Sequence, residues 1–361
     1  MLESPERLAL LSADRWDLVL RQAISAGVVG RLGALAQAHG LIDRLDPSVA
    51  RHLCVWHAVA QQQQRAVNWE LHKLSADLAD IEGPVLLLKG AAYAAAGLPP
   101  APGRMFSDID LMVPHAQLDA AEAALMLAGW ATDRMSEYDL RYYREWTHEL
   151  PPMRHLRRQT VLDLHHSILP TTARIKTRPD LILSAARPLP GFPRFSIPAP
   201  CDLVLHSATH LFHEGEWQHG LRDLVDIDAL LRAFGSEPAF WDQLLDRAAA
   251  LGLGRPLFHA LQCCRRLLHT QIPSDLLQRC PDRPGRQAAR LMERLFVAGL
   301  GAAHQSCRTA GTGAAEFALY VRSHWLRMPP HLLLPHLLYK AWQDHIEPLF
   351  EPKPEDQTVK P

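Results

Sequence analysis

The chain has 361 residues, of which 48% are hydrophobic and 21% charged, and its formal net charge is -1 at pH 7. This length suffices for roughly two or three domains, and the near-neutral charge argues against nucleic acid as the partner. No apolar run reaches the roughly 20 residues that a membrane span needs, and the N-terminal segment lacks the apolar stretch of a secretory signal. The six cysteines are scattered without a Cys-x-x-Cys pair, a pattern that predicts reduced thiols in the cytoplasm.

Residues 1–83 predict a helical N-terminal subdomain. Apolar residues recur at spacings of three and four from Arg7 onward, which is the period of an amphipathic helix. A long helix is expected over 47–81, where the glutamines of 61–64 lie among good helix formers.

Residues 84–200 predict a core that contains a sheet, because short apolar runs alternate with turn residues. Strands are expected at 85–89, 108–113 and 160–164, and helices at 91–96 and 115–128. The segment 130–150 fits either further strands or a strand and a helix. Prolines crowd the segment 188–200, which predicts an irregular connector and a domain boundary near Pro200.

Residues 201–348 predict a second helical domain, whose joints are marked by glycines and prolines. The expected helices span 201–212, 217–233, 239–251, 256–269, 285–300, 314–325 and 331–346. The polar, proline-containing residues 349–361 predict a flexible tail.

The stretch from Ser107 to Val113 carries the strongest chemical signal. In a strand, residues i and i+2 share a face and lie about 6.5 to 7 Å apart along the chain. Asp108 and Asp110 therefore point to one side, close enough to hold the same divalent ions, while the apolar residues between and after them point into a core. Asp163, on the expected strand 160–164, supplies a third carboxylate.

The run 85–90 ends in Lys89 and Gly90 and is followed by helix-favouring alanines. A strand, a glycine and a helix start in this order form an arrangement that can seat a phosphate, with the lysine as a point charge. Arg104 could clamp a phosphate through two hydrogen bonds, and Ser107 either contacts a phosphate or begins the strand.

The chain resembles the uncharacterised bacterial branch of the polymerase-beta-like nucleotidyltransferase superfamily. The resemblance is carried by Lys89-Gly90, Arg104, the run 107–113 and the later run 161–166. It departs from the superfamily at Lys89-Gly90, where Gly-Ser is usual, so a serine contact to phosphate is not carried over.

The resemblance implies an α+β fold with an α/β-type catalytic core (84–200), whose small, mixed, largely antiparallel sheet lies between the two helical parts. It also implies Mg2+-dependent transfer of a nucleoside monophosphate from an NTP, with Mn2+ as a substitute and ATP as the favoured donor. The catalytic metal ligands would be Asp108, Asp110 and Asp163. The acceptor would offer a hydroxyl or phosphate and be a small molecule, a peptide or a protein, bound by the C-terminal helices. Nothing in the pattern indicates an oligomeric state.

Other polar residues have weaker signals. His165 shares a strand face with Asp163 and could orient it or touch substrate. Asp223 and Asp226 lie on an expected helix, where each could face the acceptor or belong to a solvated surface. We interpret His206 and its neighbours at 210 and 213 as core or surface histidines, because a zinc-protease signature requires a glutamate where Ser207 stands.

Two alternative functions fit the same carboxylates. A sugar-nucleotide-dependent glycosyltransferase would use Asp108 and Asp110 to hold one metal under a diphosphate and would release no pyrophosphate. A catalytically inactive interaction protein would keep the fold and lose the chemistry. Three neighbouring carboxylates argue against the second alternative, because a binding module has no use for such repulsion.

Overall fold

The computed structural model describes residues 5–215, 217 and 219–345. Within this part of the chain, seven strands form one sheet in the order β3-β4-β5-β2-β1-β7-β6. The pairs β2·β5 and β1·β7 are parallel and the other neighbouring pairs are antiparallel, so the sheet is mixed and largely antiparallel, as predicted. The strands are β1 Val85–Leu87, β2 Ile109–Met112, β3 Trp130–Thr132, β4 Met153–His155, β5 Val161–His165, β6 Arg187–Pro188 and β7 Phe195–Ile197.

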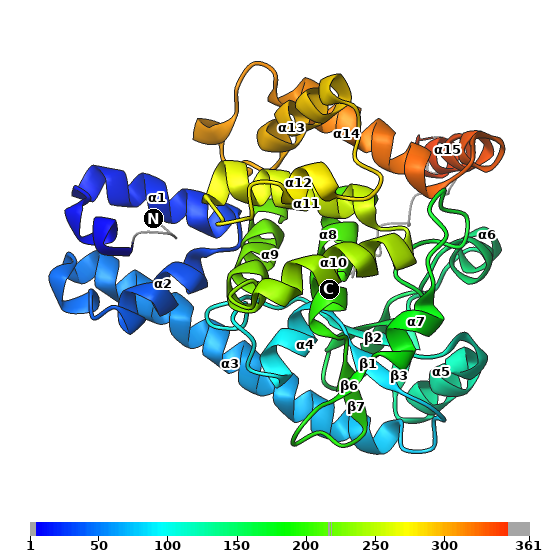
Figure 1. The fold of residues 1–361 in the computed structure, drawn as a ribbon. Coiled ribbons are helices and arrows are strands. Elements are labelled where there is room, and N and C mark those ends of the chain that lie inside the picture. The colour runs from blue at the N-terminus through cyan, green and yellow to red at the C-terminus, as the bar shows by residue number, and fades with distance from the viewer. Residues whose placement is uncertain (1–4, 216, 218, 346–361) are drawn as a thin grey trace, which may run out of the picture.

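The N-terminal region is helical, as predicted, and consists of a 3-10 turn Pro5–Leu10 followed by α1 Ala13–Ser25, α2 Val29–Ala38 and α3 Pro47–Asp77. The long helix α3 begins with Pro47 at its first helical position. The preceding residue, Asp46, caps the helix, because its side chain accepts a hydrogen bond from the Ser48 amide. Its first half packs against α1 and α2 through Leu53, and its second half joins the core of the sheet through Leu71. Figure 1 shows α3 running from the N-terminal helices toward the sheet.

The two central strands, β2 and β5, form because their apolar residues point into the core, as the sequence indicated. In β2, Ile109 and Leu111 are fully buried, and in β5, Leu162 and Leu164 are fully buried. The parallel register of β2 and β5 places Asp110 directly beside Asp163.

The helix α4 spans Lys89–Ala95 and begins earlier than predicted, because Lys89 leaves the strand with a φ of 43°. The helix after β2, α5 Leu118–Leu127, is preceded by a 3-10 turn at His115–Gln117.

Two predictions for the core were wrong or incomplete. The proline-rich segment is not an irregular connector, because it contains β6 and β7, and β7 pairs in parallel with β1. A three-residue strand fits between Pro193 and Pro198, since neither proline has to donate a hydrogen bond within it. The segment 130–150 forms β3, then α6 Glu137–Arg141, then a π-helical turn Tyr142–Trp146. A further short helix, α7, spans Pro179–Ser184.

The region after Pro200 is helical, as predicted, and its helices lie above the sheet in Figure 1. One hydrophobic core extends from the sheet into these helices as far as Phe296 and Leu319. The predicted tail lies outside the described residues, and none of the described helices has the length and apolar character to cross a membrane. The helices are α8 Pro200–Thr209, α9 Gly220–Phe234, α10 Pro238–Leu251, α11 Gly254–Leu268, α12 Leu276–Arg279, α13 Arg286–Gly299, α14 Thr312–Arg327 and α15 Pro330–His345, with a π-helical turn His210–Glu214 after α8.

Candidate active site

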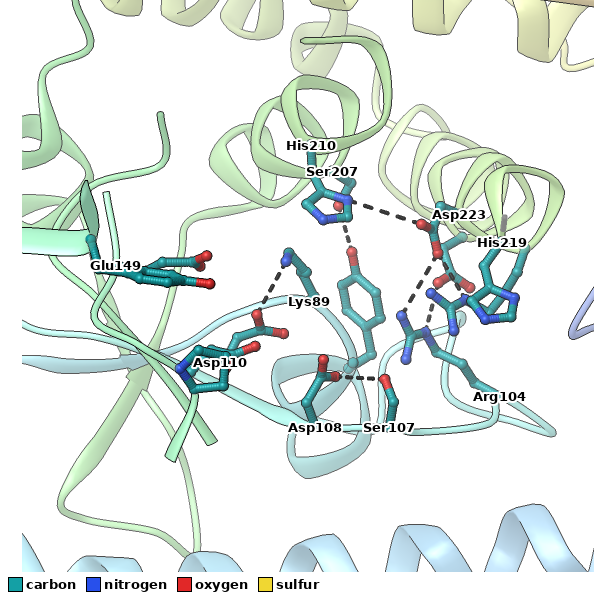
Figure 2. A pocket seen from close by; sticks show the side chains of 17 residues that line it. Lys89, Arg104, Ser107, Asp108, Asp110, Glu149, Ser207, His210, His219 and Asp223 are labelled. Carbon is teal, nitrogen blue, oxygen red and sulfur yellow. Dashed lines mark hydrogen bonds and ion pairs between the residues drawn. The ribbon is translucent and has the colours of Figure 1, made fainter. Parts of the chain in front are cut away.

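A cavity of about 320 Å3 lies where β2 and β5 face α4, α8 and α9 (Figure 2). Nine of the ten side chains and backbone positions that the sequence singled out line this cavity, and the tenth, His165, lies buried behind Asp110. Residues that are more than a hundred positions apart in the chain therefore meet in one place. The nine are Lys89, Gly90, Arg104, Ser107, Asp108, Asp110, Asp163, Asp223 and Asp226.

Three carboxylates form one wall of the cavity. Asp110 and Asp163 are neighbours across the parallel strands, and Asp108 precedes β2. The Ser107 hydroxyl donates a hydrogen bond to Asp108 Oδ1 at 2.9 Å. Asp163 Oδ1 is buried and has no hydrogen-bond partner among the described residues, so one lone pair of the site is left for a cation or a proton.

Burial and the nearness of the other carboxylates disfavour the ionised forms of two of the three aspartates. Burial, and then the charge of Asp110, raise the pKa of Asp108. Burial, followed by the charges of Asp110 and Glu149, raises the pKa of Asp163 to about 7. Burial alone would raise the pKa of Asp110, but Lys89 and His165 hold that pKa well below its ordinary value. Oxygen ligands that repel one another in this way fit Mg2+, which would relieve the repulsion.

Lys89 and Gly90 form the second wall. Lys89 Nζ lies 3.1 Å from Asp110 Oδ1, so the ammonium compensates the carboxylate. An added Cβ at Gly90 would collide with the guanidinium of Arg104, which would have to shift. The glycine at this point therefore serves close approach between α4 and the loop that precedes β2.

Comparison with known proteins identifies the family. A family model described as "Uncharacterised nucleotidyltransferase" matches residues 12–269, which include every residue named in the cavity. The chain belongs to this nucleotidyltransferase family. Among solved structures it is similar to MenT4, a nucleotidyltransferase toxin from Mycobacterium tuberculosis H37Rv, at 13% identity and a TM-score of 0.26, over 85% of this chain and 98% of that one. A search of curated proteins finds no match.

In this nucleotidyltransferase, Arg104 and Asp226 are held in a buried ion network. Arg104 Nε donates to Asp226 Oδ2 at 2.7 Å, and Arg31 Nη2 donates to Asp226 Oδ1 at 2.9 Å. Asp226 is only 2% exposed. Of the two positions that the sequence allowed for this side chain, the one on a solvated helix surface is therefore wrong. Asp223 also lines the cavity, where Arg222 Nε donates to its Oδ1 at 2.8 Å and Arg104 Nη2 lies 4.0 Å from the same oxygen.

The nucleotidyltransferase site also contains residues that sequence reasoning missed. Glu149 and Tyr143 come from the segment whose secondary structure was ambiguous, and no local pattern marked them. His210, which we interpreted as a core or surface histidine, lines the cavity because the π-helical turn after α8 places it there. Burial, and then the charge of Lys89, lower the pKa of His210 to about 3, so its imidazole is neutral. The position of His210 near the acidic wall could not be predicted from regular α-helical spacing, because a π-helical turn departs from that spacing.

Proposed function

We propose that this nucleotidyltransferase transfers a nucleoside monophosphate from an NTP, with ATP as the favoured donor, to a hydroxyl or phosphate of an acceptor. The observation that supports this function is the convergence of Asp108, Asp110 and Asp163 on one cavity beside the ammonium of Lys89. Carboxylates that share ions, next to a cation for phosphate, are the arrangement that nucleotidyl transfer requires.

The three aspartates would hold Mg2+, or Mn2+ in its place. When bound, the ions would polarise the phosphate oxygens and the attacking oxygen of the acceptor. The orphaned Oδ1 of Asp163 and the mutual repulsion of the carboxylates agree with this assignment. The donor set consists of oxygens alone, which suits a hard ion.

The chain's own residues would bind and orient the NTP. Lys89 would turn its ammonium from Asp110 to the phosphates once the negative charge of Asp110 is compensated. Arg104 would contribute through Nη1 and Nη2, which now lie 3.3 Å from the Met105 carbonyl oxygen and 4.0 Å from Asp223 Oδ1, and Ser107 through its hydroxyl. These three side chains line the same cavity as the aspartates, so they could contact one triphosphate together.

Asp163 would accept the proton of an attacking hydroxyl. Without an ion, burial and the charges of Asp110 and Glu149 raise the pKa of Asp163 to about 7, and a bound ion would lower this pKa and keep the carboxylate ionised, ready to accept a proton. The proton would go to the carboxylate oxygen of Asp163 that does not hold the ion.

The acceptor side of the cavity would be formed by the helices after residue 200. His210 and Asp223 come from these helices, and Tyr143 and Glu149 face them from the sheet side. This polar wall, on a chain of near-neutral net charge, favours a small molecule, a peptide or a protein over nucleic acid. All six cysteines are free thiols, which supports a reducing compartment such as the cytoplasm.

The proposed function is tested by incubating the purified protein with each of four NTPs labelled at the α phosphate, Mg2+ and a cell extract. We expect label to appear on an acceptor with at least one NTP and to be lost in the variant D108N/D110N. Asp119→Asn is the matched control, because this side chain is 92% exposed and does not line the cavity. If no NTP binds or donates label with Mg2+ or Mn2+ present, the proposed function is wrong.

A further inference from the structure

A second group of potential metal ligands lies beside the carboxylate wall. His148, Glu149 and His165 each offer a ligand atom, and these atoms all lie within 4.8 Å of one another. Both histidines are buried, and Glu149 faces the cavity on the side of Asp110 (Figure 2). Of these three residues the sequence marked His165 alone, because β4 and a turn separate it from His148 and Glu149.

Backbone hydrogen bonds hold the three residues opposite one another. Glu149 forms an isolated antiparallel bridge with His165 at the end of β5. The His166 amide donates to the His148 carbonyl, and the Leu150 amide donates to the Leu164 carbonyl, both at 2.9 Å. The spacing of the side chains is therefore fixed by the sheet rather than by a mobile loop.

The distances between the side chains suit a shared ion. Glu149 Oε2 lies 3.2 Å from His165 Nδ1 and 3.9 Å from His148 Nε2. Nitrogen and oxygen ligands bound about 2.0 to 2.2 Å from one tetrahedral ion lie roughly 3.3 to 3.6 Å from each other. Small side-chain rotations would bring all three within range. His165 Nδ1 is buried and its near partner is Glu149 Oε2 at 3.2 Å, so this nitrogen points into the group and an ion could replace the proton between the two side chains.

The other nitrogen of His165 gives the group a direct link to the carboxylate wall. His165 Nε2 lies 3.1 Å from Asp110 Oδ1. A histidine that binds a metal through one nitrogen usually donates from the other to a carboxylate, which fixes its tautomer and its ring orientation. Asp110, His165 and an ion at Nδ1 would form this arrangement.

We propose that His148, Glu149 and His165 bind a divalent ion of the Zn2+ type, and that this ion positions Asp110 through His165. Two imidazoles and a carboxylate favour Zn2+ over Mg2+, whereas the oxygen-only set of Asp108, Asp110 and Asp163 favours Mg2+. Three protein ligands leave a fourth position for water or for a polar group of the acceptor, since Glu149 also lines the cavity. The test of this ion site does not depend on the proposed transfer reaction, because it measures bound metal and not nucleotidyl transfer.

The wild-type protein tests the site directly. Metal-free protein is titrated with Zn2+ and with Co2+ in the presence of millimolar Mg2+, and the Zn2+ form is examined by X-ray absorption. We expect one equivalent of Zn2+ that excess Mg2+ does not displace, with scattering from two imidazoles. Absence of bound Zn2+, its displacement by Mg2+, or coordination by oxygen alone would overturn the proposal and leave His165 as a bridge between Asp110 and Glu149.

Variants then assign the ligands. His148→Ala and Glu149→Gln should weaken Zn2+ binding by more than the roughly 10- to 100-fold loss expected for Asp110→Asn, which removes only a partner of His165. His166→Ala is the matched control, because this neighbouring buried histidine packs against His115 with ring centroids 4.9 Å apart and is not in the group. Equal weakening in His166→Ala and His148→Ala would contradict the assignment. Unchanged binding in His148→Ala would contradict it as well.

Discussion

The buried network around Asp226 gives the sharpest prediction about stability. Asp226 on α9 accepts hydrogen bonds from Arg31 on α2 and from Arg104 in the loop before β2. One carboxylate thus joins the N-terminal helices, the C-terminal helices and the loop that leads into the carboxylate wall. Asp226→Asn removes the charge that neutralises two buried guanidiniums, although Arg31 still donates to the Pro100 carbonyl and Arg104 to the Met105 carbonyl.

The magnitude follows from the number of charges left uncompensated. Removing one partner of a buried ion pair lowers the free energy of unfolding by about 3 to 5 kcal/mol. D226N should fall within this range, because it orphans the charges of two arginines and Asp223 approaches Arg104 only to 4.0 Å. Arg31→Met should cost less, about 1 to 3 kcal/mol, because Asp226 keeps its hydrogen bond from Arg104. In the double variant D226N/R31M one of the two orphaned cations is gone, so its loss should be smaller than the sum of the single losses.

The assay is urea unfolding of the wild type, the two single variants and the double variant, followed by circular dichroism. Asp17→Asn is the control, because Asp17 pairs with Arg21 on an exposed helix face and should contribute less than about 1 kcal/mol. A D226N protein that unfolds at the wild-type urea midpoint would refute the reasoning. Additive losses in the double variant would refute the claim that the arginines share Asp226.

Two further predictions concern the cation of the site and the buried histidines. Lys89→Met should lower kcat/KM for the NTP by about 10- to 100-fold, mainly through KM, because it removes the cation proposed for phosphate. Steady-state kinetics measure this effect, with Lys73→Met as the control. An unchanged KM for the NTP in Lys89→Met would contradict the prediction. Burial, and then the charge of Arg322, lower the pKa of His259 to about 3. The folded state therefore favours neutral His259. This contribution to the free energy of unfolding is present above about pH 6.5 and is lost as the pH falls toward 3. His259→Phe should therefore flatten the loss of stability between pH 6 and 4 by about 1.4 kcal/mol per pH unit in urea unfolding, and an unaltered pH dependence would count against it.

The central strands and their aspartates could be predicted because the signal is local. Asp108, Asp110 and Asp163 each lie beside apolar residues that alternate with the period of a strand, and this alternation alone places the carboxylates on the opposite face. The parallel pairing of Asp110 with Asp163 could not be predicted from this local pattern, because it depends on which strands are neighbours and on their direction and register.

Other parts of the site could not be predicted because they depend on long-range contacts. Glu149 reaches the cavity through an isolated bridge to His165, which leaves no periodic pattern in its own segment. His210 faces the cavity because a π-helical turn changes the direction of its side chain after α8. The helical pattern around Asp226 allowed either an acceptor-facing or a solvated side chain. Its burial depends on long-range contacts with Arg104 and with Arg31, the latter 195 residues earlier in the chain.

The short strands between prolines were missed for a related reason. The residues from Phe195 to Ile197 have the apolar character of a strand, but three residues are too few for a period to stand out among Pro193, Pro198 and Pro200. Pairing with β1 stabilises this strand, and β1 is more than a hundred positions earlier in the chain.

The most direct test of the account compares ATP labelled at the α phosphate with ATP labelled at the γ phosphate, each incubated with the protein, Mg2+ and cell extract. If Asp108, Asp110 and Asp163 support nucleotidyl transfer, label from the α position appears on the acceptor and label from the γ position is released in pyrophosphate, and both signals disappear in D108N/D110N. Transfer of the γ label to the acceptor, or label transfer that persists in D108N/D110N, would contradict the account.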